Sequence, residues 1–328
     1  MAAYTGIQGQ NILIVSSDPA NPTEGQIWYN STSNLLKGYQ FATVNSWATG
    51  GNIGTARYRM GAAGTQTAGL IFGGAVNTGA PYETNATELY DGTSWTTSVT
   101  LPSARRGPGQ AGTQTAALAF GTKLALPGAA ITTTDKFNGS SWTNVNSMNT
   151  ARGMMGSAGV QTAALGFGGY TGVPSTSNAT EAYDGTNWTS VANYPASIRD
   201  LSGVGTQTAA LGFGGYVTGV VTTSNSWNGS SWTATSSLNN AGQGRAGFGT
   251  QAAAVAAGCG SGTAPIASTE LWNGTSWTNS TAMSNSLAFR GGLGTQPSGL
   301  VATGTPGTST AVEEWTGSLL AVKTITTS

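Results

Sequence analysis

Six times along this chain a Gln follows a Trp by 19 residues, and a Gly always stands two positions before the Gln. The pairs are Trp47 with Gln66, Trp95 with Gln114, Trp142 with Gln161, Trp188 with Gln207, Trp232 with Gln251, and Trp277 with Gln296. Successive Gln residues are 48, 47, 46, 44 and 45 residues apart. A fixed spacing inside a drifting period indicates that one structural unit is repeated and that a single connection in each unit varies in length. Function is therefore expected in the varying connection.

The composition favours short strands over helices and argues against a nucleic-acid partner. Of 328 residues, 12 are basic and 12 are acidic, far fewer than the quarter that is usual in soluble domains. The chain also has 50 Gly residues, and each Gly inside a helix costs about 0.8–1 kcal/mol relative to Ala. Because the net charge is zero and basic runs are absent, the electrostatic attraction that drives DNA or RNA binding is missing.

The residue types also argue against disulfides, metal binding and membrane insertion. Cys259 is the single cysteine, so no internal disulfide forms, and histidine, the commonest metal ligand, is absent. We therefore expect neither a cofactor nor a metal. The N-terminal segment carries no positive charge, and the apolar run Asn11–Val15 is too short for a signal sequence or a membrane span. These features predict a chain that is assembled inside a cell without membrane insertion.

Each repeat is expected to contain four antiparallel strands. In the repeat that begins at Ala151, a turn at Gly159–Thr162 precedes the apolar run Ala163–Gly169, which is typical of a buried inner strand. An Asp-Gly or Asn-Gly pair then separates two alternating segments, and such a pair predicts a hairpin with a type I′ turn. These pairs are Asp91-Gly92, Asn138-Gly139, Asp184-Gly185, Asn228-Gly229 and Asn273-Gly274.

The order of landmarks resembles the kelch repeat over about residues 40 to 320. Each repeat has an Arg before the first strand, a Gly pair after the second, an aromatic residue in the third and a Trp in the fourth. The Gly pair is complete at Gly73-Gly74, Gly168-Gly169 and Gly214-Gly215, and only its first position is kept at Gly121-Thr122 and Gly258-Cys259. The resemblance implies an all-β fold, a six-bladed kelch-like β-propeller with four antiparallel strands per blade. A strand around Tyr39 to Trp47 would complete the last blade and remove exposed edges. A seventh, degenerate blade is the alternative.

Arginines and carboxylates recur in a matching rhythm. The arginines precede the first strands, at Arg57, Arg59, Arg105, Arg106, Arg152, Arg199, Arg245 and Arg290. The partners stand two positions before the third-strand aromatic, at Glu88, Asp135, Glu181, Glu270 and Glu313, with Asn225 in the fourth repeat. One interpretation is a ring of ion pairs that links neighbouring blades, and the other is an Arg-lined mouth that binds an anionic ligand. The candidates for that mouth are Arg105, Arg152, Arg199, Arg245 and Arg290.

The aromatic residues fall into two groups. Those that recur once per repeat, such as Trp188 and Tyr183, are expected to pack between blades. Those outside the repeat lie in or beside the variable connections and are candidates for ligand binding: Tyr82, Tyr170, Tyr194 and Tyr216. The connections are Ala75–Ala86, Lys123–Thr133, Tyr170–Asn178, Tyr216–Thr223, Cys259–Ala267 and Thr305–Ala311. In a four-stranded meander they share one face with the arginine segments, so we expect a recognition surface there. Unconstrained drift of these loops is the alternative.

Catalysis receives little support from the residue types. Without His or a second Cys, the chain cannot assemble the usual pair of nucleophile and base. Glycoside hydrolysis needs only two carboxylates, and Asp200, Glu83 and Glu314 lie outside the periodic positions and the Asp-Gly turns. We expect a protein that is not an enzyme, with a glycan-cleaving hydrolase as the alternative.

The N-terminal segment lies outside the repeat and carries a motif of its own. It contains Gly25-Gln-Ile-Trp-Tyr-Asn30, a polar turn at Ser31–Asn34 and the strand Leu35-Leu-Lys37. It resembles a short β-hairpin module of tail fibres and related structural proteins of tailed bacteriophages, and the propeller is similar to ones found among marine phage structural genes. The resemblance implies a virion-attachment module at residues 1–38 and a propeller at residues 39–328.

The expected function follows from that resemblance. The chain would be a virion protein, assembled in the host cytoplasm and exposed on the particle surface, where it acts as a tail-fibre or appendage adhesin. Its N-terminal module would bind other virion proteins, and its loop face would bind a host-surface glycan or protein. The alternative is a capsid or tail decoration protein that stabilises the particle. The oligomeric state stays open: phage fibres are often trimers, which suggests a homo-oligomer, but the chain has no coiled-coil heptads.

Overall fold

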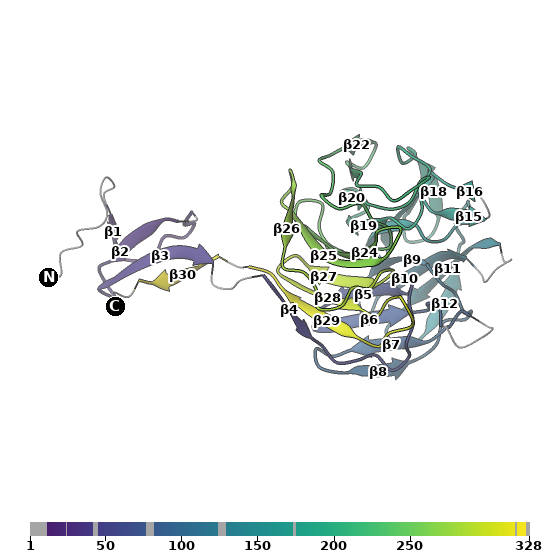
Figure 1. Ribbon diagram of the computed structural model, residues 1–328, viewed down its shortest axis with the longest axis horizontal. Coiled ribbons are helices and arrows are strands. Elements are labelled where there is room, and N and C mark those ends of the chain that lie inside the picture. The colour runs from purple at the N-terminus through teal and green to yellow at the C-terminus, as the bar shows by residue number, and fades with distance from the viewer. Residues whose placement is uncertain are drawn as a thin grey trace. The chain divides into compact units, whose positions relative to one another are not determined.

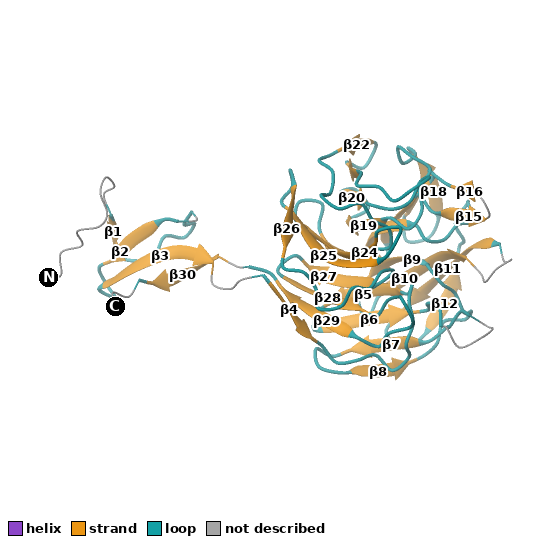
Figure 2. Cartoon of the chain, in the orientation of Figure 1, coloured by secondary structure: helices purple, strands orange, loops and turns teal. Residues whose placement is uncertain are grey.

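The structure, a computed structural model, describes residues 12–23, 25–41, 45–76, 82–123, 129–172, 175–318 and 320–325. All regular secondary structure among these residues is β-strand, as Figure 2 shows. No helix that could span a membrane occurs in these ranges. The contacts divide the chain into two units, the first made of Met1–Asn45 and Thr316–Ser328 and the second of Ser46–Trp315. The second unit contains the repeats.

Six four-stranded sheets make up the described part of the second unit, and they are numbered here in chain order. The first three are β5 (Gly61–Thr65), β6 (Ala68–Phe72), β7 (Thr87–Tyr90) and β8 (Trp95–Ser98); β9 (Gly109–Gly112), β10 (Ala117–Lys123), β11 (Ala130–Phe137) and β12 (Trp142–Val145); and β13 (Gly156–Val160), β14 (Ala163–Phe167), β17 (Thr180–Tyr183) and β18 (Trp188–Val191). The last three are β19 (Ser202–Gly205), β20 (Ala210–Phe213), β21 (Ser224–Trp227) and β22 (Trp232–Ala234); β23 (Ala246–Gly249), β24 (Ala254–Gly260), β25 (Pro265–Trp272) and β26 (Trp277–Ser280); and β27 (Gly291–Thr295), β28 (Ser298–Ala302), β29 (Val312–Thr316) and β4 (Ser46–Thr49). A small extra pair, β15 (Tyr170–Gly172) and β16 (Ser175–Thr176), extends the third sheet's connection.

The sheets pack in a β-propeller-like arrangement (Figure 1). Their first strands β5, β9, β13, β19, β23 and β27 contact one another in order, and β27 contacts β5. Buried apolar side chains form a cluster at each interface between neighbouring sheets. The cluster that contains Ile71 of the first sheet and Leu300 of the sixth shows that these two sheets also pack together. The core is therefore distributed over the interfaces between sheets.

One glutamine per repeat joins neighbouring sheets. The Nε2 of Gln161 donates hydrogen bonds to the carbonyl oxygens of Ala117, at 3.0 Å, and Phe137, in the second and third strands of the preceding sheet. The other five glutamines make the equivalent bonds. The Gly before each Gln has positive φ, and a Cβ at Gly159 would lie 2.1 Å from the carbonyl oxygen of Ala163. The Gly-x-Gln pattern is thus a tight turn that places an inter-sheet donor.

The repeated Trp contacts the same preceding sheet from the fourth strand. The Nε1 of Trp188 donates to Thr134 Oγ1 at 3.0 Å, and the indole ring centroid lies 4.7 Å from that of Phe120. Trp47, Trp142 and Trp232 donate to the equivalent threonines of their preceding sheets. The periodic Trp residues therefore serve packing between sheets.

The turns between third and fourth strands differ from the expectation, because they contain four residues and the predicted type I′ geometry is wrong. In Asp91–Ser94, the Oδ1 of Asp91 accepts hydrogen bonds from the backbone N–H groups of Thr93, at 2.8 Å, and Ser94, at 2.7 Å. Only the Gly has positive φ, +95° at Gly92, whereas a type I′ turn needs it at both central residues. The Asp or Asn side chain thus accepts from two backbone N–H groups of the turn, and the Asp91 N–H donates to the Ser94 carbonyl oxygen at 3.2 Å.

The first unit is a single four-stranded sheet in the order β1 (Leu13–Val15), β2 (Ile27–Asn30), β3 (Leu35–Phe41) and β30 (Leu320–Thr324). β1 is parallel to β2, and the other neighbours are antiparallel. β2 and β3 form the predicted hairpin around the turn at residues 31–34. The strands β1 and β30 extend the hairpin on both sides.

The carboxylate of Asp18 connects the strands of the first unit. It accepts hydrogen bonds from Lys37 Nζ at 2.8 Å, Asn30 Nδ2 at 2.8 Å and Trp28 Nε1 at 3.1 Å. These donors, Lys37 above all, lower the pKa of Asp18 to about 2 from its usual 3.8. Three residues of the N-terminal motif, Trp28, Asn30 and Lys37, therefore share one acceptor, the carboxylate of Asp18.

The boundary between the units differs from the expected division at residues 38 and 39. Tyr39 lies in β3 and pairs with Val322 of β30, so it belongs to the first unit. The strand that pairs with β29 is β4, which begins at Ser46. The residues from Thr316 onward also belong to the first unit. β30 pairs along the edge of β3, and the sequence of a single strand does not reveal which edge it will join.

We expect Gln161→Ala to lower the free energy of unfolding by about 1–3 kcal/mol, because two carbonyl oxygens of the preceding sheet lose their donor. Urea denaturation followed by circular dichroism measures this change. The exposed neighbour Thr162 provides the matched control, and Thr162→Ala should stay within about 0.5 kcal/mol of the parent. Equal stability of the two variants would contradict the bridging role of the glutamine.

The first unit should lose stability in acid. The pKa of Asp18 in the folded protein, about 2, lies below its ordinary value of 3.8, so its stabilising effect is present above pH 3.8 and is lost as the pH falls toward 2. The indole N–H signal of Trp28 in an NMR titration reports this transition. Asp18→Asn should abolish it, whereas Asp91→Asn, at a turn of the second unit, should leave it unchanged. A Trp28 signal that is insensitive to Asp18→Asn would refute the assignment.

Candidate functional site

One end of the second unit, called here the loop face, carries two kinds of segment. Crossing segments link the fourth strand of one sheet to the first strand of the next, and the variable connections join second and third strands. Backbone bridges pair the two kinds, as between Arg199 and Tyr216 and between Gly153 and Tyr170. This confirms that they share one end. Residues 77–81, 124–128 and 173–174 of the expected connections lie outside the described residues.

Two of these connections are shorter than the sequence suggested. In the second sheet β10 and β11 pair as far as Lys123 and Ala130, and in the fifth sheet β24 and β25 pair as far as Gly260 and Pro265. Both ladders contain an irregularity where the Gly pair would stand in the other repeats. The strands therefore continue into segments that were expected to be loops.

Six residues at equivalent places in the crossing segments form a ring, called here the axial ring. They are Arg59, Gly107, Met154, Asp200, Gly244 and Phe289, with φ between +53° and +61°. The backbone N–H of each donates to the carbonyl oxygen of the ring residue in the preceding sheet, at 2.7 to 2.9 Å. Because Arg59 donates to Phe289, the six hydrogen bonds form a closed cycle.

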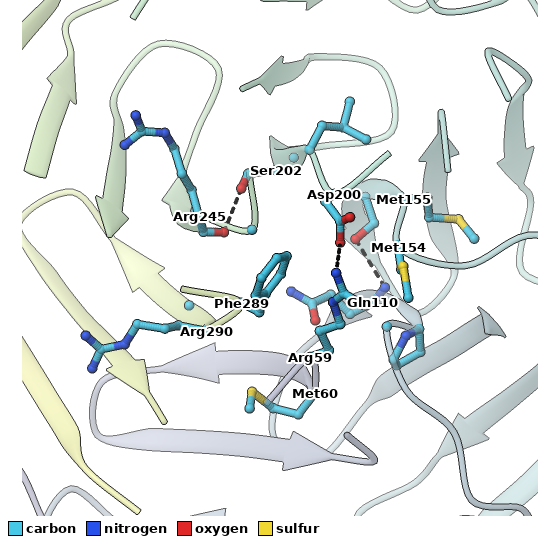
Figure 3. Close-up of a pocket in the computed structure, with 18 residues that line it drawn as sticks. Arg59, Met60, Gln110, Met154, Met155, Asp200, Ser202, Arg245, Phe289 and Arg290 are labelled. Atoms are coloured by element: carbon cyan, nitrogen blue, oxygen red, sulfur yellow. Dashed lines mark hydrogen bonds and ion pairs between the residues drawn. The ribbon is translucent and has the colours of Figure 1, made fainter. Parts of the chain in front are cut away.

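The axial ring surrounds a hollow of about 90 Å³ (Figure 3). Glycine adopts positive φ without strain, and two ring positions carry it. The other four carry Arg, Met, Asp and Phe, each at a cost on the order of 1–3 kcal/mol for a non-glycine residue in this region. Side chains kept at such a cost indicate a role that a glycine could not perform.

Two arginines share the carboxylate of Asp200 at this ring. Arg59 Nη2 lies 3.1 Å from Asp200 Oδ1, and Arg199 Nη1 lies 2.8 Å from Asp200 Oδ2. Figure 3 shows Arg59 and Asp200 pointing toward each other across the hollow, although they come from the first and fourth sheets. The guanidinium of Arg59 also lies 4.1 Å from the centroid of the Phe289 ring. The cluster of Arg59, Arg199 and Asp200 carries a net charge of +1.

Arg199 also contacts two tyrosine rings on the loop face. Its guanidinium carbon is 4.4 Å from the Tyr216 centroid and 5.6 Å from the Tyr170 centroid. Both tyrosines are partly exposed, and the Arg199 side chain is 27% exposed. Cation–π contacts hold the guanidinium in place without neutralising its charge. The structure therefore brings together three of the candidates from the sequence, Tyr170, Arg199 and Tyr216.

The remaining arginine candidates are buried and paired. Arg245 and Arg290 reach the wall of the hollow, but Figure 3 shows their guanidinium groups pointing away from it. Arg152 Nη2 lies 3.1 Å from Glu181 Oε1, and burial lowers the pKa of Arg152 to about 10, so it stays charged at neutral pH. Equivalent pairs are Arg57 with Glu88, Arg105 with Asp135, Arg245 with Glu270, and Arg290 with Glu313. Both members of each pair belong to the same repeat, which corrects the expectation that they link neighbouring blades.

The carboxylates of these pairs also hold the crossing segments. Glu181 accepts hydrogen bonds from the backbone N–H groups of Asn149, at 2.7 Å, and Thr150, at 3.2 Å. Glu88, Glu270 and Glu313 make the same two bonds in their repeats. A carboxylate satisfied by one arginine and two N–H groups is a structural element, which explains the rhythm in the sequence.

The fourth sheet departs from this pattern. Ile198 stands two positions before the ring residue, where the first three sheets carry Arg57, Arg105 and Arg152. Asn225 Nδ2 donates to the hydroxyl of Tyr194 at 2.9 Å. Tyr194 is 1% exposed, and burial raises its pKa to about 12. The expectation that Tyr194 contributes to a binding surface is therefore corrected, because its ring fills the core against Phe167. The arginine of this repeat, Arg199, stands one position after Ile198 and forms an ion pair with Asp200.

The other candidates from the sequence lie apart from this cluster or have partners. Tyr82 is 48% exposed, in the connection of the first sheet. Glu83 faces Arg106, with 3.6 Å between Oε1 and Nε, and Glu314 accepts a hydrogen bond from the Tyr90 hydroxyl. Within the described ranges, no group of three or more His, Cys, Asp or Glu residues is placed to hold a metal ion.

Comparisons with known proteins bear on the fold. No protein-family model matches the chain, and no curated protein matches it. Among solved structures, the chain is similar to one described as "Structure of YjhT", with a TM-score of 0.65 and 14% sequence identity. The match covers 83% of this chain and 96% of that chain. At such low identity the similarity supports the all-β, β-propeller-like fold and nothing about function.

Arg152→Met should lower the free energy of unfolding by about 3–5 kcal/mol, because it leaves the buried carboxylate of Glu181 without its cation. The double variant with Glu181→Gln should recover part of that loss, since the uncompensated charge is removed. Arg199→Met is the matched control: its side chain is partly exposed, so we expect a loss below about 1 kcal/mol. Urea denaturation of the parent, the two single arginine variants and the double variant measures these changes. Equal losses of unfolding free energy in Arg152→Met and Arg199→Met would contradict the structural role of the Arg152–Glu181 pair.

Proposed function

We propose that this chain is a non-enzymatic structural protein of a bacteriophage virion, a tail-fibre or appendage adhesin that binds a host-surface glycan or protein. Its second unit is proposed to be a six-bladed, kelch-like β-propeller that β4 closes. Its first unit binds other virion proteins, and its loop face is exposed on the particle surface.

The contacts between the first and sixth sheets support a closed propeller. Gln66 Nε2 donates to the carbonyl oxygens of Gly299 and Trp315 in the sixth sheet, at 3.0 Å each. The Arg59 N–H makes the equivalent ring bond to Phe289. The interface between these sheets is thus built from the same bonds as the other five. A closed ring of this kind has no exposed strand edge between its first and last blades.

The first unit has features that suit attachment. The residues that carry its resemblance to phage appendage modules, Trp28, Asn30 and Lys37, all donate to Asp18, so the motif encodes a defined small fold. Apolar side chains stay exposed on it, with Ile14 71% and Leu13 49% exposed. Clustered exposed apolar residues are typical of surfaces that contact another protein.

The observation that carries the adhesin proposal is the cluster of Arg199, Tyr170 and Tyr216 on the loop face. Five other arginines, Arg57, Arg105, Arg152, Arg245 and Arg290, are buried in ion pairs, whereas Arg199 and both tyrosines are partly exposed. It lies where the fourth repeat departs from the others. Both oxygens of Asp200 are held by arginines, which favours binding over use of this carboxylate as a catalytic acid.

Adsorption of variant particles tests the proposal. In a phage that lacks the parental protein and is complemented with variants, Tyr216→Ala should lower the rate constant of adsorption to host cells about tenfold, equivalent to about 1.4 kcal/mol. Immunoblots of purified particles should show normal incorporation. Thr186→Ala, at an exposed turn on the opposite end of the second unit, is the control and should adsorb normally.

The other outcomes separate the alternatives. If the protein is incorporated and adsorption is unchanged by Tyr216→Ala and by Arg199→Ala, the adhesin role is wrong and a decoration role is favoured. If purified particles lack the protein, the virion assignment fails. Release of soluble sugar from host polysaccharide, lost in Asp200→Asn, would show a hydrolase instead.

A further inference from the structure

We propose that Arg199 and Arg59 bind a carboxylate group of an acidic polysaccharide at the axial ring. This inference rests on the adhesin function proposed above and adds the chemical class of its ligand. It commits to a carbohydrate chain that carries uronic-acid-type carboxylates, with the carboxylate as the group that is recognised.

The distribution of charge points to an anion at this place. The chain has 12 basic and 12 acidic residues and no net charge. Five arginines pair one-to-one with the carboxylates of their own repeats, and Arg106 faces Glu83. Arg59 and Arg199 are left with a single carboxylate, Asp200. Meanwhile Asp91 and Asp184 lie in turns at the opposite end, where backbone N–H groups lower their pKa. The cluster of Arg59, Arg199 and Asp200 on the loop face is thus left with an excess of one positive charge.

The two guanidinium groups keep N–H donors that Asp200 does not use. Each arginine makes a single ion contact with Asp200, through Nη2 of Arg59 and Nη1 of Arg199. A guanidinium offers five N–H donors in a planar fork that matches a carboxylate. A second carboxylate would complete an arrangement of two arginines and two carboxylates. The stacking of Arg59 on Phe289 and of Arg199 beside the two tyrosines holds both guanidinium groups in position beforehand.

The size of the hollow indicates that only an end or side group enters it. Its volume of about 90 Å³ is well below the roughly 300–1,000 Å³ of sites that enclose a whole small ligand. The rest of the ligand must therefore lie across the loop face. That requirement fits a polymer displayed on a surface better than a free metabolite.

The surroundings favour a saccharide over an acidic peptide. Tyr170 and Tyr216 present partly exposed rings beside Arg199, and the C–H face of a sugar stacks on such rings while its carboxylate meets the guanidinium. Peptides commonly bind by adding a strand to an open sheet edge. The backbone N–H groups of the axial ring are all engaged in the cycle, so the ring offers no such edge.

Binding of oligogalacturonate to the full chain tests the inference by isothermal titration calorimetry. Arg199→Gln should weaken binding at least tenfold. Asp200→Asn should strengthen it several-fold, because the carboxylate that competes for both arginines is gone. Asn also tolerates the left-handed backbone of position 200, where φ is +54°, so the variant should fold. Arg106→Gln, which alters an arginine of the loop face away from the cluster, is the control and should bind like the parent.

Three further ligands test the chemical class: neutral dextran, dextran sulfate and polyglutamate. Oligogalacturonate should be preferred over each at equal ionic strength, and raising the salt concentration should weaken its binding. Failure to bind oligogalacturonate, equal binding of any of the other three, or an Asp200→Asn variant without a gain in affinity would each overturn the inference. Misfolding does not raise affinity, so stronger binding by the Asp200→Asn variant is the decisive result. If adsorption depends on Tyr216 but oligogalacturonate does not bind, the ligand class fails while the adhesin function stands.

Discussion

The cycle of backbone hydrogen bonds in the axial ring is the constraint on which the second unit depends. Each ring residue donates to one neighbour and accepts from the other, so displacing one crossing segment strains two bonds and, through them, the whole cycle. The glutamine contacts repeat this closure at the opposite end, from Gln66 in the first sheet to Trp315 in the sixth. The distance between sheets is therefore set at both ends of every first strand.

These contacts explain why the chain keeps the interval from Trp to Gln constant. The interval spans the fourth strand, the crossing segment and the first strand, which together contain the contacts. The connections between second and third strands take no part in either cycle, and their lengths vary.

Most of the few charged residues of the second unit serve in buried arginine–carboxylate pairs that hold the crossing segments. A buried pair such as Arg152 and Glu181 is weakly favourable at best as an ion pair, because both groups lose their hydration. Its value lies in the position of the carboxylate, which also accepts two N–H groups of the crossing segment that leads to the axial ring. The pair thus orders the crossing segment that ends at the axial ring.

In the fourth sheet Ile198 and Asn225 replace the pair, and Tyr194 fills the core there instead. An arginine one position later is then free to act at the surface, which connects a local change in packing to the candidate site.

Much of this architecture was accessible from the sequence, and the parts that were not have identifiable physical reasons. The repeat, the four strands, the association of arginines with carboxylates and the shared loop face all follow from periodic residues. The axial ring does not, because positive φ at Arg59, Met154 or Phe289 is imposed by the hydrogen-bonded cycle against the preference of the residue itself. The four-residue turns were misjudged because an Asp-Gly pair signals a turn without specifying how many residues the turn contains. Tyr194 was misplaced because its burial depends on the loss of an arginine in the same repeat, a dependence that appears only when the crossing segments are compared position by position. The role of Asp18 was missed since its three partners lie 10, 12 and 19 residues away.

The position of the candidate site depends on the closed cycle of hydrogen bonds in the axial ring. Arg59 and Asp200 belong to the first and fourth sheets, which are three steps apart in either direction along the cycle of six described sheets, so their ion pair spans the hollow. Neither residue could meet the other in an open row of sheets. The same pair is also the place where the repeat is least regular, because ring positions that are uncharged in the other four repeats carry side chains of opposite charge here. A repeated scaffold distributes equal residues to six equivalent places, and a ligand that binds at one place needs those places to differ. Arg59, Asp200 and Phe289 supply that difference in the axial ring, where hydrogen bonds join the six crossing segments. Arg199 pairs with Asp200 and extends the cluster to Tyr170 and Tyr216 on the loop face.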